Sequence, residues 1–186
     1  MIKLVQHHTS FWLLAPIMII AAGLVVRIFI FQHDCGHGSF FSSRKANMIL
    51  GNLCGLMTFT PYEEWKHLHA EHHACSGDLE RRGVGDILTM TLDEYRKAPF
   101  WTRFGYRLYR NPLILFVIGP PIQFVLLQRL YPKGASKRQK KSVIMTDLAL
   151  VGIIVFMSWA IGLRTYLLIQ APIIGFASIK IGRAHV

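Results

Sequence analysis

The chain has 186 residues, of which 52% are hydrophobic, and its mean hydropathy is +0.35. This composition is too apolar for an ordinary soluble domain and indicates a membrane protein. The net charge of +11 would also suit a nucleic-acid-binding protein. However, many basic residues fall in short loops beside apolar segments, which is typical of cytoplasmic loops, so we expect membrane lipids and no nucleic acid as partners.

The apolar segments predict an all-α membrane protein. Residues 11–30 are apolar except for Arg27 and are long enough to span a membrane. Residues 47–60 are too short for a confident span and are expected to be re-entrant or interfacial. Residues 113–127 are interrupted by Gly-Pro-Pro at 119–121, which predicts a kinked pair of half-helices at that break.

Two further spans are predicted near the end of the chain. Residues 143–163 form an apolar run that contains Asp147, and residues 165–179 form another. The basic loop 133–141 and the polar segment 63–110 are expected on the cytoplasmic side, so residues 113–127 would enter and leave on one face. Both histidine clusters then face the cytoplasm. A straight span over 113–129 would instead place the basic loop outside.

Histidines are concentrated in two short sequences. His33 and His37 are four residues apart, which places them on one face of a helix, and the triplet His69, His72 and His73 has spacings of three and four. Imidazole is the commonest protein ligand for iron, zinc and copper. The pattern predicts a metal centre at the membrane surface. A zinc protease motif is not matched because no glutamate follows the first histidine of either cluster directly.

Three kinds of site stay open: the metal centre of an enzyme, a bis-histidine haem, and a metal or haem site in a membrane module without turnover. A bis-histidine haem would need only two of these side chains. The neighbouring Asp34, Glu71 and His67 would either orient ligating imidazoles or lie in solvent. The cysteines Cys35, Cys54 and Cys75 form no C-x-x-C pair and are expected to be reduced structural thiols.

The residues HDCGHGSFF at 33–41 and HAEHHACSGDLERRG at 69–83 resemble the first and second histidine boxes of the membrane fatty acid desaturases, in particular the bacterial acyl-lipid type related to Δ12 (omega-6) enzymes. The resemblance implies an O2-dependent desaturase of the bacterial inner membrane that introduces a cis double bond into a membrane acyl chain. It also implies a non-haem di-iron centre and a cytoplasmic electron donor of the ferredoxin or cytochrome type. A hydroxylase or ketolase of the same superfamily is the alternative. The implied metal ligands are His33, His37, His69, His72 and His73.

The resemblance also predicts the domain organisation. The third histidine box of the family is absent, so residues 1–180 are interpreted as a truncated desaturase domain that is inactive alone. The sequence IGRAHV at 181–186 matches a translated sequencing adapter and is interpreted as a tail foreign to the domain.

Overall fold

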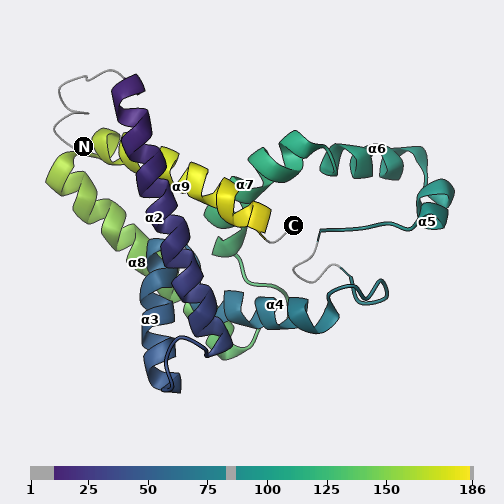
Figure 1. Ribbon diagram of the computed structural model, residues 1–186, viewed down its shortest axis with the longest axis horizontal. Coiled ribbons are helices and arrows are strands. Elements are labelled where there is room, and N and C mark those ends of the chain that lie inside the picture. Colours follow the sequence, from purple (N-terminus) through teal and green to yellow (C-terminus); the bar gives the residue numbers. More distant parts are fainter. Residues whose placement is uncertain (1–10, 83–86, 185–186) are drawn as a thin grey trace.

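The computed structural model describes residues 11–82 and 87–184, and it forms helices without strands in these two ranges (Figure 1). The α-helices in chain order are α2 (Phe11–His37), α3 (Arg44–Met57), α4 (Tyr62–Cys75), α5 (Leu92–Lys97), α6 (Phe100–Tyr109), α7 (Gly119–Val125), α8 (Lys137–Ile161) and α9 (Leu163–Ala184). A π-helix, η1 (Ile114–Ile118), precedes α7, and a short 3-10 helix, η2 (Leu127–Arg129), follows it.

Three of the described helices are long and apolar enough to cross a membrane, namely α2, α8 and α9. The all-α membrane fold predicted from the sequence is therefore confirmed. Their large apolar side chains are exposed, with Trp12 at 81% and Trp159 at 83%. Exposed apolar side chains on this scale are typical of a surface that contacts lipid.

The spans formed by α2 and α8 are longer than predicted. Helix α2 continues past Ile30 to His37, so the first histidine pair belongs to the same helix as the membrane segment. Helix α8 begins at Lys137, inside the basic loop, because Ser136 and Gln139 form a capping box that starts the helix there. Basic side chains thus occupy the first turns of α8.

The break expected at Gly119-Pro120-Pro121 lies elsewhere. The chain bends by 56° between α6 and the helical run Ile114–Arg129, which is either a broken span or a re-entrant loop. The prolines instead occupy the first turn of α7, where an α-helix needs no backbone N–H donor. The predicted kink is correct in kind, but it occurs at residues 110–113.

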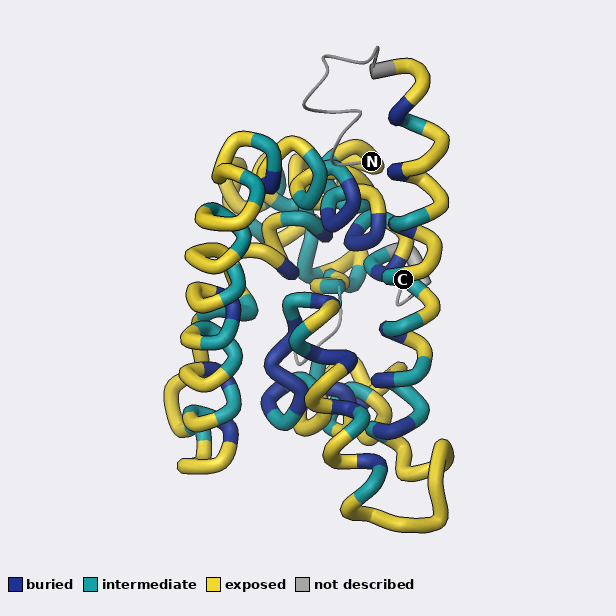
Figure 2. The backbone as a smooth tube through the Cα atoms, turned by 90° about the vertical axis from the view of Figure 1, so that its left-hand side faces the viewer, coloured by how far each residue is buried: buried dark blue, intermediate teal, exposed yellow. Residues whose placement is uncertain are grey.

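Helix α9 packs across α2 and ends later than predicted. Leu14, Met18 and Ala22 of α2 form a buried cluster with Ile173 and Ala177 of α9, and the two helices lie against each other along much of their length (Figures 1 and 2). The helix also passes residue 179, where we expected it to end.

A second cluster lies near the end of α9, where Ile181 is buried with Phe29 and Phe124. The first four residues of the segment 181–186 therefore belong to α9, while residues 185 and 186 lie outside the described ranges. Its interpretation as a foreign tail stays a prediction.

Candidate metal centre

The two histidine sequences meet where the C-terminal turns of α2 lie against α4. Gly36, between His33 and His37, permits this close approach, since a Cβ atom added there would lie 2.9 Å from the ring of Trp65. Trp65 is rigid and packs edge-on against Phe29 of α2. A side chain at Gly36 would therefore push α4, and the histidines that it carries, away from α2.

Four imidazoles converge at this contact. His33 and His37 of α2 and His69 and His73 of α4 each offer a ring nitrogen, and these atoms all lie within 4.8 Å of one another. The Nε2 atom of His37 is 3.3 Å from that of His33 and 3.1 Å from that of His69. The Nε2 atoms of His69 and His73 are also 3.1 Å apart.

This donor set fits a metal ion. A neutral ring nitrogen carries either one proton or one lone pair, and a single proton on Nε2 of His37 cannot point at both of its neighbours. Nitrogen ligands bound at about 2 Å from a common ion lie roughly 3 Å apart when they are neighbours on it, as the three closest pairs of these nitrogens do. One transition-metal ion would accept the lone pairs of all four side chains.

Neighbouring side chains fix two of these imidazoles. The carboxylate of Asp34 lies 3.3 Å from Nδ1 of His33, where it can accept the N–H of a histidine that ligates through Nε2. The indole of Trp65 stacks on His69, with ring centroids 4.6 Å apart and an interplanar angle of 15°. Sequence reasoning missed Trp65, although its position four residues before His69 places both on one helical face.

The structure separates the other predicted site residues from this group. His72 is not among the four converging histidines, because a residue three positions after His69 is rotated away from the face that His69 shares with His73. It lines both cavities beside the site instead. His67 and Glu71 form an exposed ion pair with each other, 3.3 Å apart, on neither of the converging faces.

Buried polar contacts hold the turn between α3 and α4 from two sides. The Thr58 hydroxyl donates a hydrogen bond of 2.7 Å to Gln32 of α2. Arg129 of η2 donates to the carbonyl of Phe59 and, over 2.6 Å, to Asp147 of α8. Because this turn leads directly into α4, these contacts fix the position of the second histidine pair relative to the first. They also supply the partner of Asp147, a charge that sequence analysis left unpaired.

Two cavities adjoin the four histidines. One of about 560 Å³ lies between α4 and the η1–α7 segment, is mostly apolar, and has His69 in its wall together with Phe29, Leu68, Leu115 and Phe124. A second, of about 1060 Å³, is lined by His33, His69 and His73 and by Asp78 and Arg82 on the following loop. The centre thus lies between a mostly apolar cavity and a second cavity whose wall carries more polar and charged groups.

One buried carboxyl group borders the apolar cavity. Glu64 is only 5% exposed, and burial raises its pKa above the ordinary 4.5. It is one turn before Leu68 and His69 on α4 and lines the same cavity as His69. Sequence analysis gave Glu64 no role.

Comparison with known proteins identifies the family. A family model described as "Fatty acid desaturase" matches residues 10–181. The chain belongs to the fatty acid desaturase family. It is 43% identical over 164 residues to a "Fatty acid desaturase" of Bacillus subtilis (strain 168), which covers 88% of this chain and 47% of that protein.

More distant relatives are also desaturases. The chain is 29% identical over 161 residues to the "sn-1 acyl-lipid omega-3 desaturase (ferredoxin)" of Synechocystis, covering 81% of this chain and 43% of that protein. It is 35% identical over 112 residues to an endoplasmic-reticulum omega-3 fatty acid desaturase of Nicotiana tabacum, covering 59% of this chain and 28% of that protein. The chain thus spans less than half the length of these relatives. No solved structure matches.

Proposed function

We propose that the chain carries part of the active centre of an O2-dependent desaturase, which introduces a cis double bond into the acyl chain of a membrane lipid. The observation that carries the proposal is the convergence of four imidazoles from two distant segments beside an apolar cavity. Membership of the desaturase family supports desaturation over the other reactions that histidine-ligated metals carry out.

The metal ligands that we propose are His33, His37, His69, His72 and His73. The four converging side chains suit one ion, and His72, whose ring centroid is 5.6 Å from that of His73, is proposed as a ligand of a second. When bound, a di-iron centre would supply the oxidising power that side chains lack, since an unactivated methylene group has no acidic proton to remove. Asp34 would orient His33 by accepting its Nδ1–H.

The apolar cavity is the proposed site of the acyl chain. Phe29, Leu68, Leu115 and Phe124 line it, and these side chains would hold hydrocarbon and exclude water. His69 stands in the same wall, so a chain seated there would place one segment of its length beside the histidines. Fixing the chain in this way is what selects the carbon atoms that react.

The electron donor and the membrane orientation follow from the same proposal. We propose a cytoplasmic donor of the ferredoxin or cytochrome type, as the name of the Synechocystis relative states for that protein. The basic residues at the start of α8 support a cytoplasmic position for this end of the helix. The α4 end that carries Glu63 contacts α8 there, through Arg138, which supports a centre facing the bacterial cytoplasm.

A chimera tests the function without assuming where the natural chain begins or ends. Residues of this chain would replace the matching 164-residue segment of the Bacillus subtilis relative, and the membrane fatty acids of a host lacking desaturases would be analysed by gas chromatography with mass detection. We expect new monounsaturated acids from the chimera and none after His37→Ala or His69→Ala. The control variant His67→Ala should retain product, because His67 pairs with Glu71 outside the centre.

The same experiment separates the alternatives. Hydroxylated or keto acids in place of alkenes would favour the hydroxylase or ketolase reading. Unchanged product from His37→Ala and His69→Ala would contradict the proposed ligands. A folded chimera that binds iron but forms no product would contradict the desaturase function while leaving the metal site intact.

A further inference from the structure

Helix α6 presents three chemically different faces. Phe100, Trp101, Phe104 and Leu108 share one side at 3.6 residues per turn. Tyr106 and Tyr109 lie on the opposite side. Between them, and adjacent to the aromatic face, lie Arg103 and Arg107, followed by Arg110 at the C-cap. Arg107 donates to the hydroxyl of Tyr95, and Arg110 lines the second cavity, so Arg103 is the arginine that faces away from the protein's own contacts.

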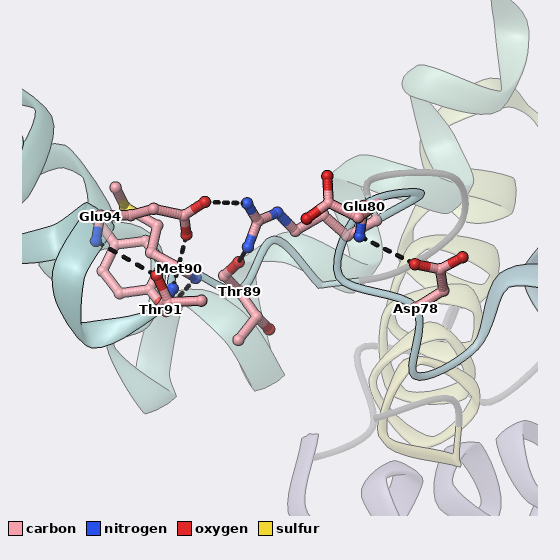
Figure 3. Close-up of polar contacts among 8 residues, drawn as sticks. Asp78, Glu80, Thr89, Met90, Thr91 and Glu94 are labelled. Atoms are coloured by element: carbon pink, nitrogen blue, oxygen red, sulfur yellow. Dashed lines mark hydrogen bonds and ion pairs between the residues drawn. The ribbon is translucent and has the colours of Figure 1, made fainter.

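The tyrosine face attaches α6 to the rest of the protein. The hydroxyl of Tyr109 accepts a hydrogen bond from the backbone N–H of Leu88, and that of Tyr106 accepts one from the N–H of Met90. Residues Leu88 and Met90 belong to the extended segment before α5, which Arg82 and Glu94 hold in place (Figure 3). The side of α6 that faces the protein is therefore its polar side.

Within the part of the chain that the structure describes, no residue covers the aromatic face. Trp101 is 76% exposed, Phe100 is 62% exposed, and no residue of α6 is buried. The helix lies away from the α2–α9 core, on the side of the molecule opposite α8 (Figure 1). An exposed patch of large aromatic side chains needs an apolar partner, because leaving it in water is unfavourable.

The arginines identify that partner. An apolar face with aromatic residues, flanked by cations, is the pattern of a helix that lies in the interface of a membrane. A second copy of the chain docking through this face would bring both sets of arginines together, at an electrostatic cost, whereas an anionic lipid surface would attract them.

The bend after α6 agrees with this position. The apolar run Ile114–Arg129 leaves α6 at an angle of 56°, and its exposed residues, among them Val117, Ile118 and Ile122, continue the apolar surface. A helix lying in the interface followed by a segment that enters the bilayer would require such a bend.

We propose that α6 is an interfacial helix that inserts its aromatic face into the membrane surface, with Arg103 on anionic headgroups. Through Tyr106 and Tyr109 the helix would anchor the segment at residues 88–90 to the bilayer surface. The adjacent Ile87 lines both cavities next to the histidines, so membrane contact at α6 would set the position of one cavity wall. The proposal does not depend on the metal chemistry.

Nitroxide labels on two faces of α6 test the proposal. The 186-residue chain would be reconstituted in phosphatidylcholine vesicles with and without phosphatidylglycerol, carrying either Leu108→Cys or the matched control Thr102→Cys. Thr102 is exposed but lies on the tyrosine side of the helix, away from the aromatic face. The three native cysteines are buried, and the chain without an added cysteine gives the background signal. Power saturation then compares relaxation by O2, which concentrates in hydrocarbon, with relaxation by a water-soluble nickel complex.

The expected result is a severalfold higher O2-to-nickel ratio at position 108 than at position 102, with the label at 108 about 5–10 Å into the boundary between headgroups and acyl chains. Arg103→Gln should make this label shallower in vesicles with phosphatidylglycerol and leave it unchanged without. A label at 108 that is accessible to nickel, or shielded from both reagents by protein, would overturn the proposal. A depth at the bilayer centre would show a spanning helix instead, and no effect of the arginine variant would overturn the role of anionic lipid.

Discussion

The histidine centre and the α5–α6 segment differ in how deeply the residues that hold them are buried. Beside the centre, the contact between Gln32 and Thr58 is fully buried, and the pair of Arg129 with Asp147 is partly buried. In α5 and α6 no residue is buried, and Arg82 and Glu94, which hold this segment (Figure 3), have 26% and 41% of their side chains exposed. The comparison teaches that the positions of the metal ligands are fixed by buried contacts, which are costly to break. The position of the α5–α6 segment instead depends on what the segment contacts outside the core.

The largest effect is expected from breaking the contact of Arg129. Arg129→Met removes the partner of Asp147 and of the Phe59 carbonyl, leaving a partly buried carboxylate unpaired. We expect a loss of about 3 kcal/mol in the free energy of unfolding, measured by denaturant titration in detergent. The matched variant is Arg138→Met, which breaks the pair with Glu63 on a side chain that is 67% exposed and should cost less than about 1 kcal/mol. Equal losses of unfolding free energy in the two variants would show that the Arg129 contact is no more important for stability than an exposed ion pair.

Glu64 makes the buried region sensitive to pH. Burial raises its pKa above 4.5, with smaller opposing effects of Gln139 and His67 and a reinforcing effect of Glu71. A raised pKa means that the stability present below pH 4.5 is lost as the pH rises through the native pKa. Glu64→Gln keeps the group neutral, so its melting temperature should exceed that of the unmodified chain at pH 7.

The two melting temperatures should converge below pH 4.5, where Glu64 is protonated in both the folded and the unfolded chain. A scan of melting temperature against pH for both proteins measures this. A constant difference across the whole range would show that the effect of the substitution is not due to ionisation.

The smallest effect is expected in the exposed segment. The guanidinium of Arg82 and the backbone N–H of Thr91 hold the pKa of Glu94 at about 2. A lowered pKa gives stability that is present above pH 4.5 and is lost as the pH falls toward 2. Because both side chains are partly exposed, screening by water keeps this contribution small. Arg82→Ala should therefore lower the free energy of unfolding only slightly at pH 7, raise the pKa of Glu94 toward 4.5 in an NMR titration, and speed proteolysis after residue 87. A large loss of global stability would show that this segment is part of the core.

The part of the site that depends only on helix periodicity could be predicted from the sequence. The spacing of four residues in His33 and His37, and in His69 and His73, places each pair on one helical face, and the structure brings the two pairs together. We also predicted that His72 shares the face of His69 and His73, but the structure does not place His72 among the four converging histidines. Its assignment as a ligand stays a prediction.

Other features depended on tertiary contacts that periodicity does not contain. The Arg129–Asp147 pair joins two elements, and the contact of Arg129 with Phe59 joins residues 70 positions apart in the sequence. The bend moved from Gly119 to residues 110–113 because the first turn of α7 accommodates both prolines. The end of α9 was misjudged because Ile181 gains burial against Phe29 and Phe124, which extends the helix past the apolar run.

The most direct test of the account is iron binding by the histidines of α2 and α4. The chain in lipid nanodiscs would be offered Fe(II) and Zn(II) together without oxygen, and bound metal would be measured by elemental analysis and X-ray absorption. The account predicts iron with imidazole nitrogen scattering, lost in His37→Ala and in His69→Ala and retained in His67→Ala. Stoichiometric zinc with no iron, or iron binding that survives both substitutions, would contradict it.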